Sequence, residues 1–243
     1  TGAAFGLDFR FVDIVESSAQ FRISFRNTPN TSGGVTASTS VQFGNARAGQ
    51  RHFRIFLDDT LQAVAQTVIK DSTLNLEAGK NYTVLLWGYA RTGSTPTMRL
   101  SVFEENVPAP FDEKTQVALR VINTTGTTYD VRQYPCTGTV PAGVTWTTGP
   151  LSISNYVFVA PGQIRYNVQP AGGGTAVFTD PLALIGAAPT IDIEGLPGTT
   201  VAGAAATIII FPPAVTGSKA PQTFTTTGSS FIWDRRPPRP AGT

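Results

Sequence analysis

Residues 119–124 read Leu-Arg-Val-Ile-Asn-Thr, and residues 9–14 read Phe-Arg-Phe-Val-Asp-Ile, so one short pattern occurs twice in a chain of 243 residues. Both copies place an arginine second and a short polar side chain fifth, among aromatic and aliphatic residues. This composition is typical of β-strands. A pattern that returns after a long interval indicates a duplicated domain.

Further segments repeat in the same order around this pattern. Residues 48–55 correspond to 161–168, residues 76–86 to 201–210, and residues 100–108 to 230–238. Each match is weak by itself, but their common order indicates two copies of one domain.

The repeated segments have the pattern of strands. Phe21–Arg26 and Ile164–Gln169 alternate apolar and polar side chains, as half-buried strands do. Glycine turns such as Gly33-Gly34 and Gly172–Gly174 separate the segments. We therefore expect an all-β fold of two tandem immunoglobulin-like antiparallel β-sandwich domains. Leu61–Ile69 also fits a helical stripe, but we expect it to be mostly strand.

The predicted domain boundaries follow from the repeat and from a proline-rich stretch. Residues 1–107 form the first sandwich repeat, 108–114 a linker, and 115–243 the second repeat with an Arg/Pro arm. Both repeats fall near the usual domain length of about 100–150 residues. The second repeat carries an insertion, Cys136–Ser154, with Trp146 inside it.

Composition and charge exclude several classes of protein. The net charge is +2 and no basic run is interleaved with aromatic residues, so we expect no nucleic-acid partner. No apolar run approaches the roughly 20 residues of a transmembrane helix. The single Cys136 excludes an intramolecular disulfide. The sequence starts at Thr1 without methionine, so we expect an extracytoplasmic protein, periplasmic or at the cell surface, after signal-peptide removal.

Three segments resemble one bacterial family. They are Leu119–Thr124 followed by Tyr129-Asp130-Val131, the turn Ala160-Pro161-Gly162 with its strand to Val168, and Leu76–Val84, which is the most specific. In these segments the chain resembles the domain of unknown function 4397 family. The resemblance implies extracytoplasmic proteins, often built of tandem immunoglobulin-like or transthyretin-like β-sandwiches, and it implies no enzyme activity.

The residues that carry most enzyme chemistry are scarce and separated. His52 is the only histidine and lies in the alternating segment Arg51–Arg54, whereas Cys136 is in the other repeat. Nucleophilic and zinc sites need such groups clustered. Asp58–Thr60 and Glu104–Asn106 are the candidates for calcium, but turns and strand ends explain them better. We expect no catalytic site, metal or cofactor.

The remaining distinctive residues suggest contact with a protein partner. An apolar N-terminal stretch contains Phe5, the insertion contains Trp146, and an arm over residues 234–243 contains Arg235, Arg236 and Arg239. These residues are the candidate partner-binding residues. Alternatively, the N-terminal stretch is a first strand, the insertion folds over the core, and the arm packs on its own domain. Phe231 and Trp233, just before the arm, share one strand face and are expected in the core.

These observations favour a non-enzymatic structural or scaffolding protein that binds other proteins. The expected partners are copies of itself in a surface assembly or a membrane complex that it joins from the periplasmic side. Deletion of residues 234–243 is expected to weaken assembly without changing stability. The alternative function is a glycan-binding or adhesin module, for which Trp146 and Tyr134 would supply exposed rings.

Overall fold

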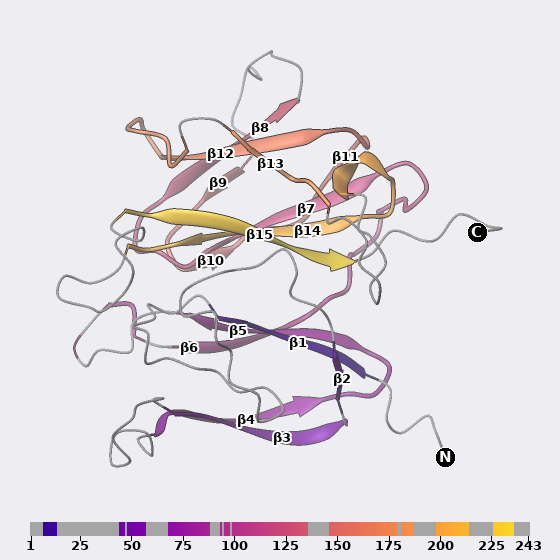
Figure 1. Ribbon diagram of the computed structural model, residues 1–243, viewed down its shortest axis with the longest axis vertical. Coiled ribbons are helices and arrows are strands. Elements are labelled where there is room, and N and C mark those ends of the chain that lie inside the picture. Colours follow the sequence, from indigo (N-terminus) through magenta and orange to yellow (C-terminus); the bar gives the residue numbers. More distant parts are fainter. Residues whose placement is uncertain are drawn as a thin grey trace. The chain divides into compact units, whose positions relative to one another are not determined.

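The structure of the chain is a computed structural model. It describes residues 7–13, 44–46, 48–56, 68–87, 93, 95–97, 99–135, 146–178, 181–186, 198–213 and 226–235. The chain divides into two compact units, with the main division at Asn106/Val107. The described strands up to Glu104 belong to the first unit and those from Val117 to the second, while Pro212, Pro213 and Thr226 are grouped with the first (Figure 1).

The first unit contains a mixed sheet of order β2-β1-β5-β6 and a separate antiparallel pair, β3-β4. The sheet consists of β1 (Leu7–Asp13), β2 (Gly44–Ala46), β5 (Asn81–Trp87) and β6 (Arg99–Glu104). The pair consists of β3 (Gly49–Phe56) and β4 (Val68–Leu76).

The two sheets of the first unit share a core. Leu76 at the end of β4 packs with Tyr82 and Val84 of β5, and all three side chains are buried. Half-buried side chains from both layers complete the cluster: Ala48, Phe53, Leu74, Leu100 and Val102. The unit is therefore built of two packed layers.

The second unit contains two larger sheets. One has the order β10-β7-β14-β15, with β11 also paired to β7, and the other has the order β13-β12-β8-β9. The first of these consists of β7 (Val117–Asn123), β10 (Ser152–Ile153), β11 (Val157–Val159), β14 (Ala205–Phe211) and β15 (Gly228–Arg235). The second consists of β8 (Tyr129–Pro135), β9 (Trp146–Thr148), β12 (Ile164–Pro170) and β13 (Leu182–Ala183).

One apolar core lies between these two sheets. Tyr166 of β12 is fully buried, and its ring meets Phe178 and Phe231 edge-on at centroid distances of 6.0 and 6.5 Å. Phe231 in turn meets Trp233 at 5.8 Å. The prediction that Phe231 and Trp233 complete the second core is confirmed.

The all-β fold is confirmed for the described residues, but the pairing is not entirely antiparallel. β1 runs parallel to β5, and β7 runs parallel to β14. The chain passes through the opposite sheet between the two members of each pair, and a long connection of this kind allows it to return in the same direction. The two sheets that contain these pairs are therefore mixed, whereas the other described pairings are antiparallel, as expected.

The repeated sequence segments occupy equivalent places in the two units. The Phe-Arg-Phe and Leu-Arg-Val segments form β1 and β7, and the segments matched further along form β5 and β14. Even the register agrees, because Arg10 lies opposite Thr83 and Arg120 lies opposite Thr207. Whether both units are immunoglobulin-like remains a prediction.

Helical structure in the described part is limited to the 3-10 turn η2 (Gly198–Thr200). Among these residues, no helix is long and apolar enough to cross a membrane. Of the ambiguous stretch Leu61–Ile69, the last two residues belong to β4, and the others lie outside the described residues.

The predicted linker contains a hydrogen-bonded turn centred on Asp112. The carboxylate of Asp112 accepts hydrogen bonds from the Lys114 N–H at 2.9 Å and the Thr115 hydroxyl at 2.7 Å. These bonds, that from Lys114 foremost, hold the pKa of Asp112 below its usual range. Beside the turn, the ring of Phe111 lies 5.4 Å from that of Phe158 on β11.

The pKa of Tyr166 gives a test of the second core. Burial raises this pKa well above the ordinary value of 10.0, while the hydrogen bond with Ser229 acts in the opposite direction. The contribution of Tyr166 to stability should be complete below pH 10 and should be lost as the pH rises further, because only the unfolded chain then ionises. We expect the stability of Tyr166→Phe to fall less steeply above pH 10, as measured by urea unfolding. If the free energy of unfolding fell equally steeply with pH in the original protein and in Tyr166→Phe, the raised pKa of Tyr166 would be contradicted.

Candidate functional site

Most of the predicted partner-binding residues lie outside the described residues. This applies to Phe5, Arg236 and Arg239. Arg235 is the last residue of β15, and its backbone pairs with Ala205 of β14. Asp234 and Arg235, which were expected in the arm, therefore belong to the strand β15.

Trp146 does not lie on an exposed loop. It begins β9, pairs with Val131 of β8, and leaves only 6% of its surface exposed within the second core. The interpretation of Trp146 as a surface anchor was wrong, and the alternative of a segment folded over the core is correct for this residue. The reason is that the Trp-Thr-Thr segment adds a strand to the edge of β8 and turns the indole inward.

His52 lies on the surface of the first unit. Its Nε2 contacts Oδ1 of Asp71 across the β3-β4 pair, and the two side chains are 51% and 43% exposed. Glu104, once considered for calcium, instead forms an ion pair with Lys80 at 2.9 Å. Within the described ranges, no three His, Cys, Asp or Glu side chains gather closely enough to hold a metal ion.

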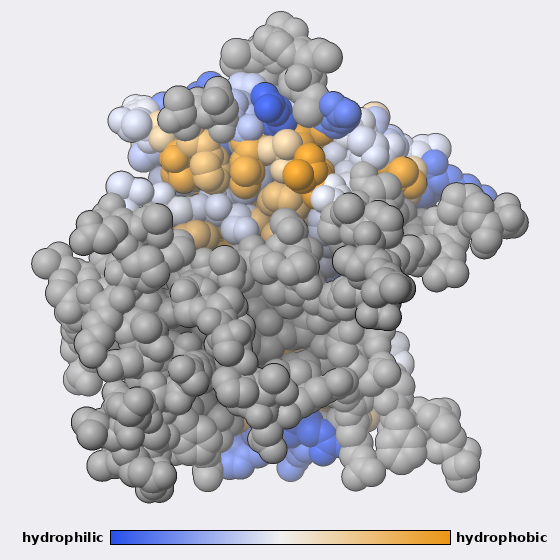
Figure 2. All heavy atoms as spheres, in the orientation of Figure 1, coloured by the Kyte–Doolittle hydropathy of each residue, from blue (hydrophilic) through white to orange (hydrophobic). Residues whose placement is uncertain are grey.

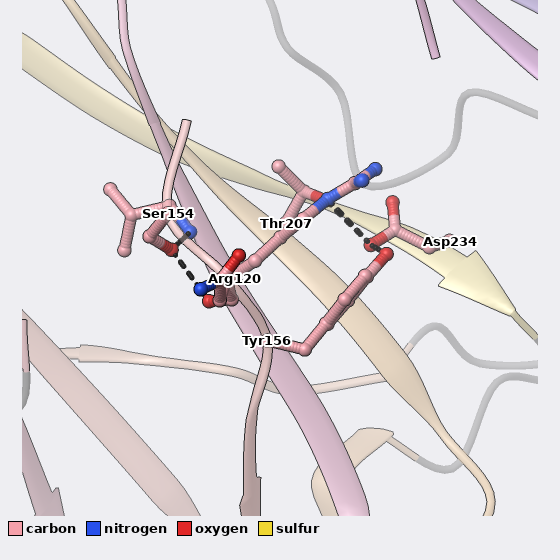
Figure 3. A network of polar contacts seen from close by, with 7 residues as sticks. Arg120, Ser154, Tyr156, Thr207 and Asp234 are labelled. Carbon is pink, nitrogen blue, oxygen red and sulfur yellow. Dashed lines mark hydrogen bonds and ion pairs between the residues drawn. The ribbon is translucent and has the colours of Figure 1, made fainter. Parts of the chain in front are cut away.

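A group of connected polar side chains in the second unit is buried beside β7. We call it the Arg120 network; its members are Arg120, Tyr156, Thr207 and Asp234 (Figure 3). Nε of Arg120 donates a hydrogen bond to Thr207 Oγ1 at 2.7 Å, and that hydroxyl donates to Asp234 Oδ2 at 2.5 Å. Arg120 and Asp234 also form an ion pair, with Nε and Oδ2 3.8 Å apart.

Tyr156 covers this charged pair. Its hydroxyl donates to Asp234 Oδ2 at 3.2 Å, and the Arg120 guanidinium lies 4.8 Å from the centre of its ring. The side chains of Arg120 and Asp234 are only 9% and 1% exposed. In such a shielded place, charge-assisted hydrogen bonds and a cation–π contact compensate for lost hydration.

Each member of the Arg120 network comes from a different segment. Arg120 is on β7, Thr207 on β14 and Asp234 on β15, while Tyr156 precedes β11. Asp234 is the extra residue of a β-bulge, because Ala205 pairs with Arg235 while Ala206 pairs with Trp233. The Asp234 Oδ2 atom accepts hydrogen bonds from two of these segments and pairs with a third. The arrangement can therefore hold three strands and their cover in register.

A second polar cluster fixes the far end of β7. The Asn123 amide donates to the carbonyl oxygens of Thr127, Thr148 and Gly149, at 2.8, 3.2 and 2.9 Å. Its oxygen accepts hydrogen bonds from the N–H and hydroxyl of Thr125, at 3.0 and 2.8 Å. The side chain is 1% exposed, so it joins β7, its following turn and the end of β9 without help from solvent.

Both clusters lie within or beside the segments that resemble a known family. A family described as domain of unknown function (DUF4397) matches residues 9–134, more than half of the 243 residues. The chain belongs to this family. The DUF4397 match runs from β1 to β8 and includes Arg120 and Asn123. No curated protein matches the chain.

The DUF4397 match crosses the division between the two units at Asn106/Val107. One copy of the family domain in each unit therefore remains a prediction. The segment Leu119–Thr124 carries part of the family resemblance, but its sequence pattern did not predict roles for Arg120 or Asp234. A usable signal existed, because an arginine occupies the same place in both sequence copies.

Removing one member of the buried ion pair should be costly. Asp234→Asn leaves the Arg120 charge without its counter-ion, and we expect a loss of about 3–5 kcal/mol in the free energy of unfolding. Adding Arg120→Met should cost less than the sum of the single changes, because the charge is then removed as well. Urea unfolding gives the free energy of unfolding of each single variant and of the double variant. Asp130→Asn, at a half-buried carboxylate on the other sheet, is the control, and strict additivity would contradict the coupling.

Replacement of the Asn123 amide should destabilise the second unit. Asn123→Asp preserves the shape but directs an acceptor at three carbonyl oxygens, and we expect a loss of about 3 kcal/mol or more in stability. The matched control is Asn155→Asp, because Asn155 is exposed. Thermal melting of both variants provides the comparison, and equal melting temperatures would show that the Asn123 contacts contribute little.

Proposed function

We propose that the protein is a non-enzymatic structural subunit that binds other proteins outside the cytoplasm. It serves either in an assembly of its own copies or on the periplasmic face of a membrane complex. The basic Arg/Pro segment after β15 is the main point of attachment in this proposal.

The proposal is carried by the way β15 ends. Asp234 accepts hydrogen bonds from Thr207 and Tyr156 and forms an ion pair with Arg120. Arg235 follows it as the last residue of β15. The sequence Arg-Pro-Pro-Arg-Pro follows directly at residues 236–240. A partner bound to residues 236–240 is therefore attached to the sheet through the buried contacts of Asp234.

The chemistry of residues 236–240 suits recognition. Proline restricts the backbone to a narrow range of φ, so such a segment loses little entropy when a partner orders it. Arginine presents a planar fork of donors that matches carboxylates in two-point contacts. Together these properties favour a protein surface that carries acidic groups.

The alternative of a glycan-binding module loses its main support. That interpretation required exposed aromatic rings at Trp146 and Tyr134, but Trp146 lies in the core and Tyr134 is half-buried on β8. We therefore do not propose it further.

The test changes charges after the strand while leaving Asp234 intact. In Arg236→Gln/Arg239→Gln, we expect at least a tenfold loss of the natively purified assembly, measured by size-exclusion chromatography with light scattering after cross-linking. The control is Arg99→Gln/Lys114→Gln, which removes the same charge from exposed places in the first unit and the predicted linker.

The melting temperature of the double variant should equal that of the original protein, since neither residue belongs to β15. An unchanged assembly in Arg236→Gln/Arg239→Gln would refute attachment through this segment. A protein that is monomeric and without partners in native extracts would refute the structural role itself.

A further inference from the structure

The outer face of the sheet β13-β12-β8-β9 carries two arginines, Arg132 and Arg165, whose Nε atoms have no hydrogen-bond partner among the described residues. On β8 and β12, Val131, Tyr166 and Val168 point into the core, so the alternate residues lie on the opposite face. Arg132 lies opposite Asn167 and Arg165 lies opposite Tyr134, which makes the two arginines diagonal neighbours. Figure 2 shows hydrophilic residues over this part of the second unit, next to a group of hydrophobic ones.

Each guanidinium group has one donor without an acceptor in the part of the chain that the structure describes. Nε of Arg132 and Nε of Arg165 are both shielded from solvent and lack a hydrogen-bond partner there. Both side chains are half-buried, so their outer edges remain accessible. Elsewhere in this unit a buried arginine, Arg120, has both an acceptor and a counter-ion.

Acidic groups are scarce in the described strands that hold these arginines. In the four strands of this sheet, the only carboxylate is Asp130, whose Oδ1 accepts a hydrogen bond from the Thr147 hydroxyl at 2.8 Å. The Asn167 amide, which lies opposite Arg132, is hydrogen-bonded to the backbone of Phe178 and carries no negative charge. The described strands of this sheet therefore carry more positive than negative charge, with Arg132 and Arg165 against the single Asp130.

We propose that Arg132 and Arg165 bind two carboxylates at alternate positions of an extended acidic segment of a partner protein. Diagonal neighbours in an antiparallel sheet are about 7 Å apart. Alternate side chains of an extended strand are separated by a similar distance, about 6.6 Å. A carboxylate that reaches the exposed edge of a guanidinium accepts hydrogen bonds from its Nη groups and balances its charge, so two carboxylates at this spacing suit the two arginines.

This inference rests on the proposed function and specifies the chemistry of one partner surface. The probe is a fluorescein-labelled pentapeptide with glutamate at positions 2 and 4 and threonine elsewhere. Its analogue with glutamine at both positions is the matched control peptide. Fluorescence anisotropy at low salt should show at least tenfold tighter binding of the acidic peptide.

Substitution of the arginines should remove this preference. We expect Arg132→Gln and Arg165→Gln each to weaken binding of the acidic peptide several-fold, and the double variant at least tenfold. Arg99→Gln, on an exposed strand position of the first unit, should leave binding unchanged. Thermal melting checks that the variants fold, while the comparison of the two peptides needs no variant.

Several results would overturn the inference. These are equal affinity for the two peptides, undiminished binding by the folded double variant, or binding of inorganic phosphate but not of the acidic peptide. The proposed function is tested separately through Arg236 and Arg239. If those changes abolish the native assembly while the peptide does not bind, only the present inference fails; if the peptide binds but no native assembly exists, only the proposed function fails.

Discussion

Burial of both faces of β7 and β14 is the constraint on which the second unit depends. Every residue of both strands is buried, so each polar side chain on them must find its partner inside the protein. Arg120 and Thr207 find theirs in Asp234 on β15, under the cover of Tyr156. Asn123 finds its partners in the turns at the other end. The hydrogen bonds and the ion pair of these buried polar side chains therefore position the neighbouring strands, together with apolar packing.

The sequence predicted a good part of this architecture. The repeated segments are strands at equivalent places in the two units, and Phe231 and Trp233 lie on the core face, as alternation indicates. Strand direction was not predictable in the same way. Alternation reports which face a residue occupies but not which strand lies beside it, and the parallel pairs arise from long-range connections.

The polar network shows a second limit of the sequence. An arginine between Leu119 and Val121 has the pattern of a solvent-facing residue, and its counter-ion at Asp234 is more than a hundred residues away along the chain. Trp146 was misplaced for a related reason, because three residues of strand are too short for alternation to be recognised. In both cases the decisive contacts are between segments far apart in sequence.

The bulge at Asp234 has a consequence for the solubility of the protein. β15 is the last strand of its described sheet, and an unbroken outer strand is a template on which further chains can add. The extra residue interrupts the regular spacing of the ladder and increases the local twist. The bulge is therefore a local obstacle to uncontrolled sheet growth along β15. The residue that balances a buried charge also discourages aggregation at this strand end.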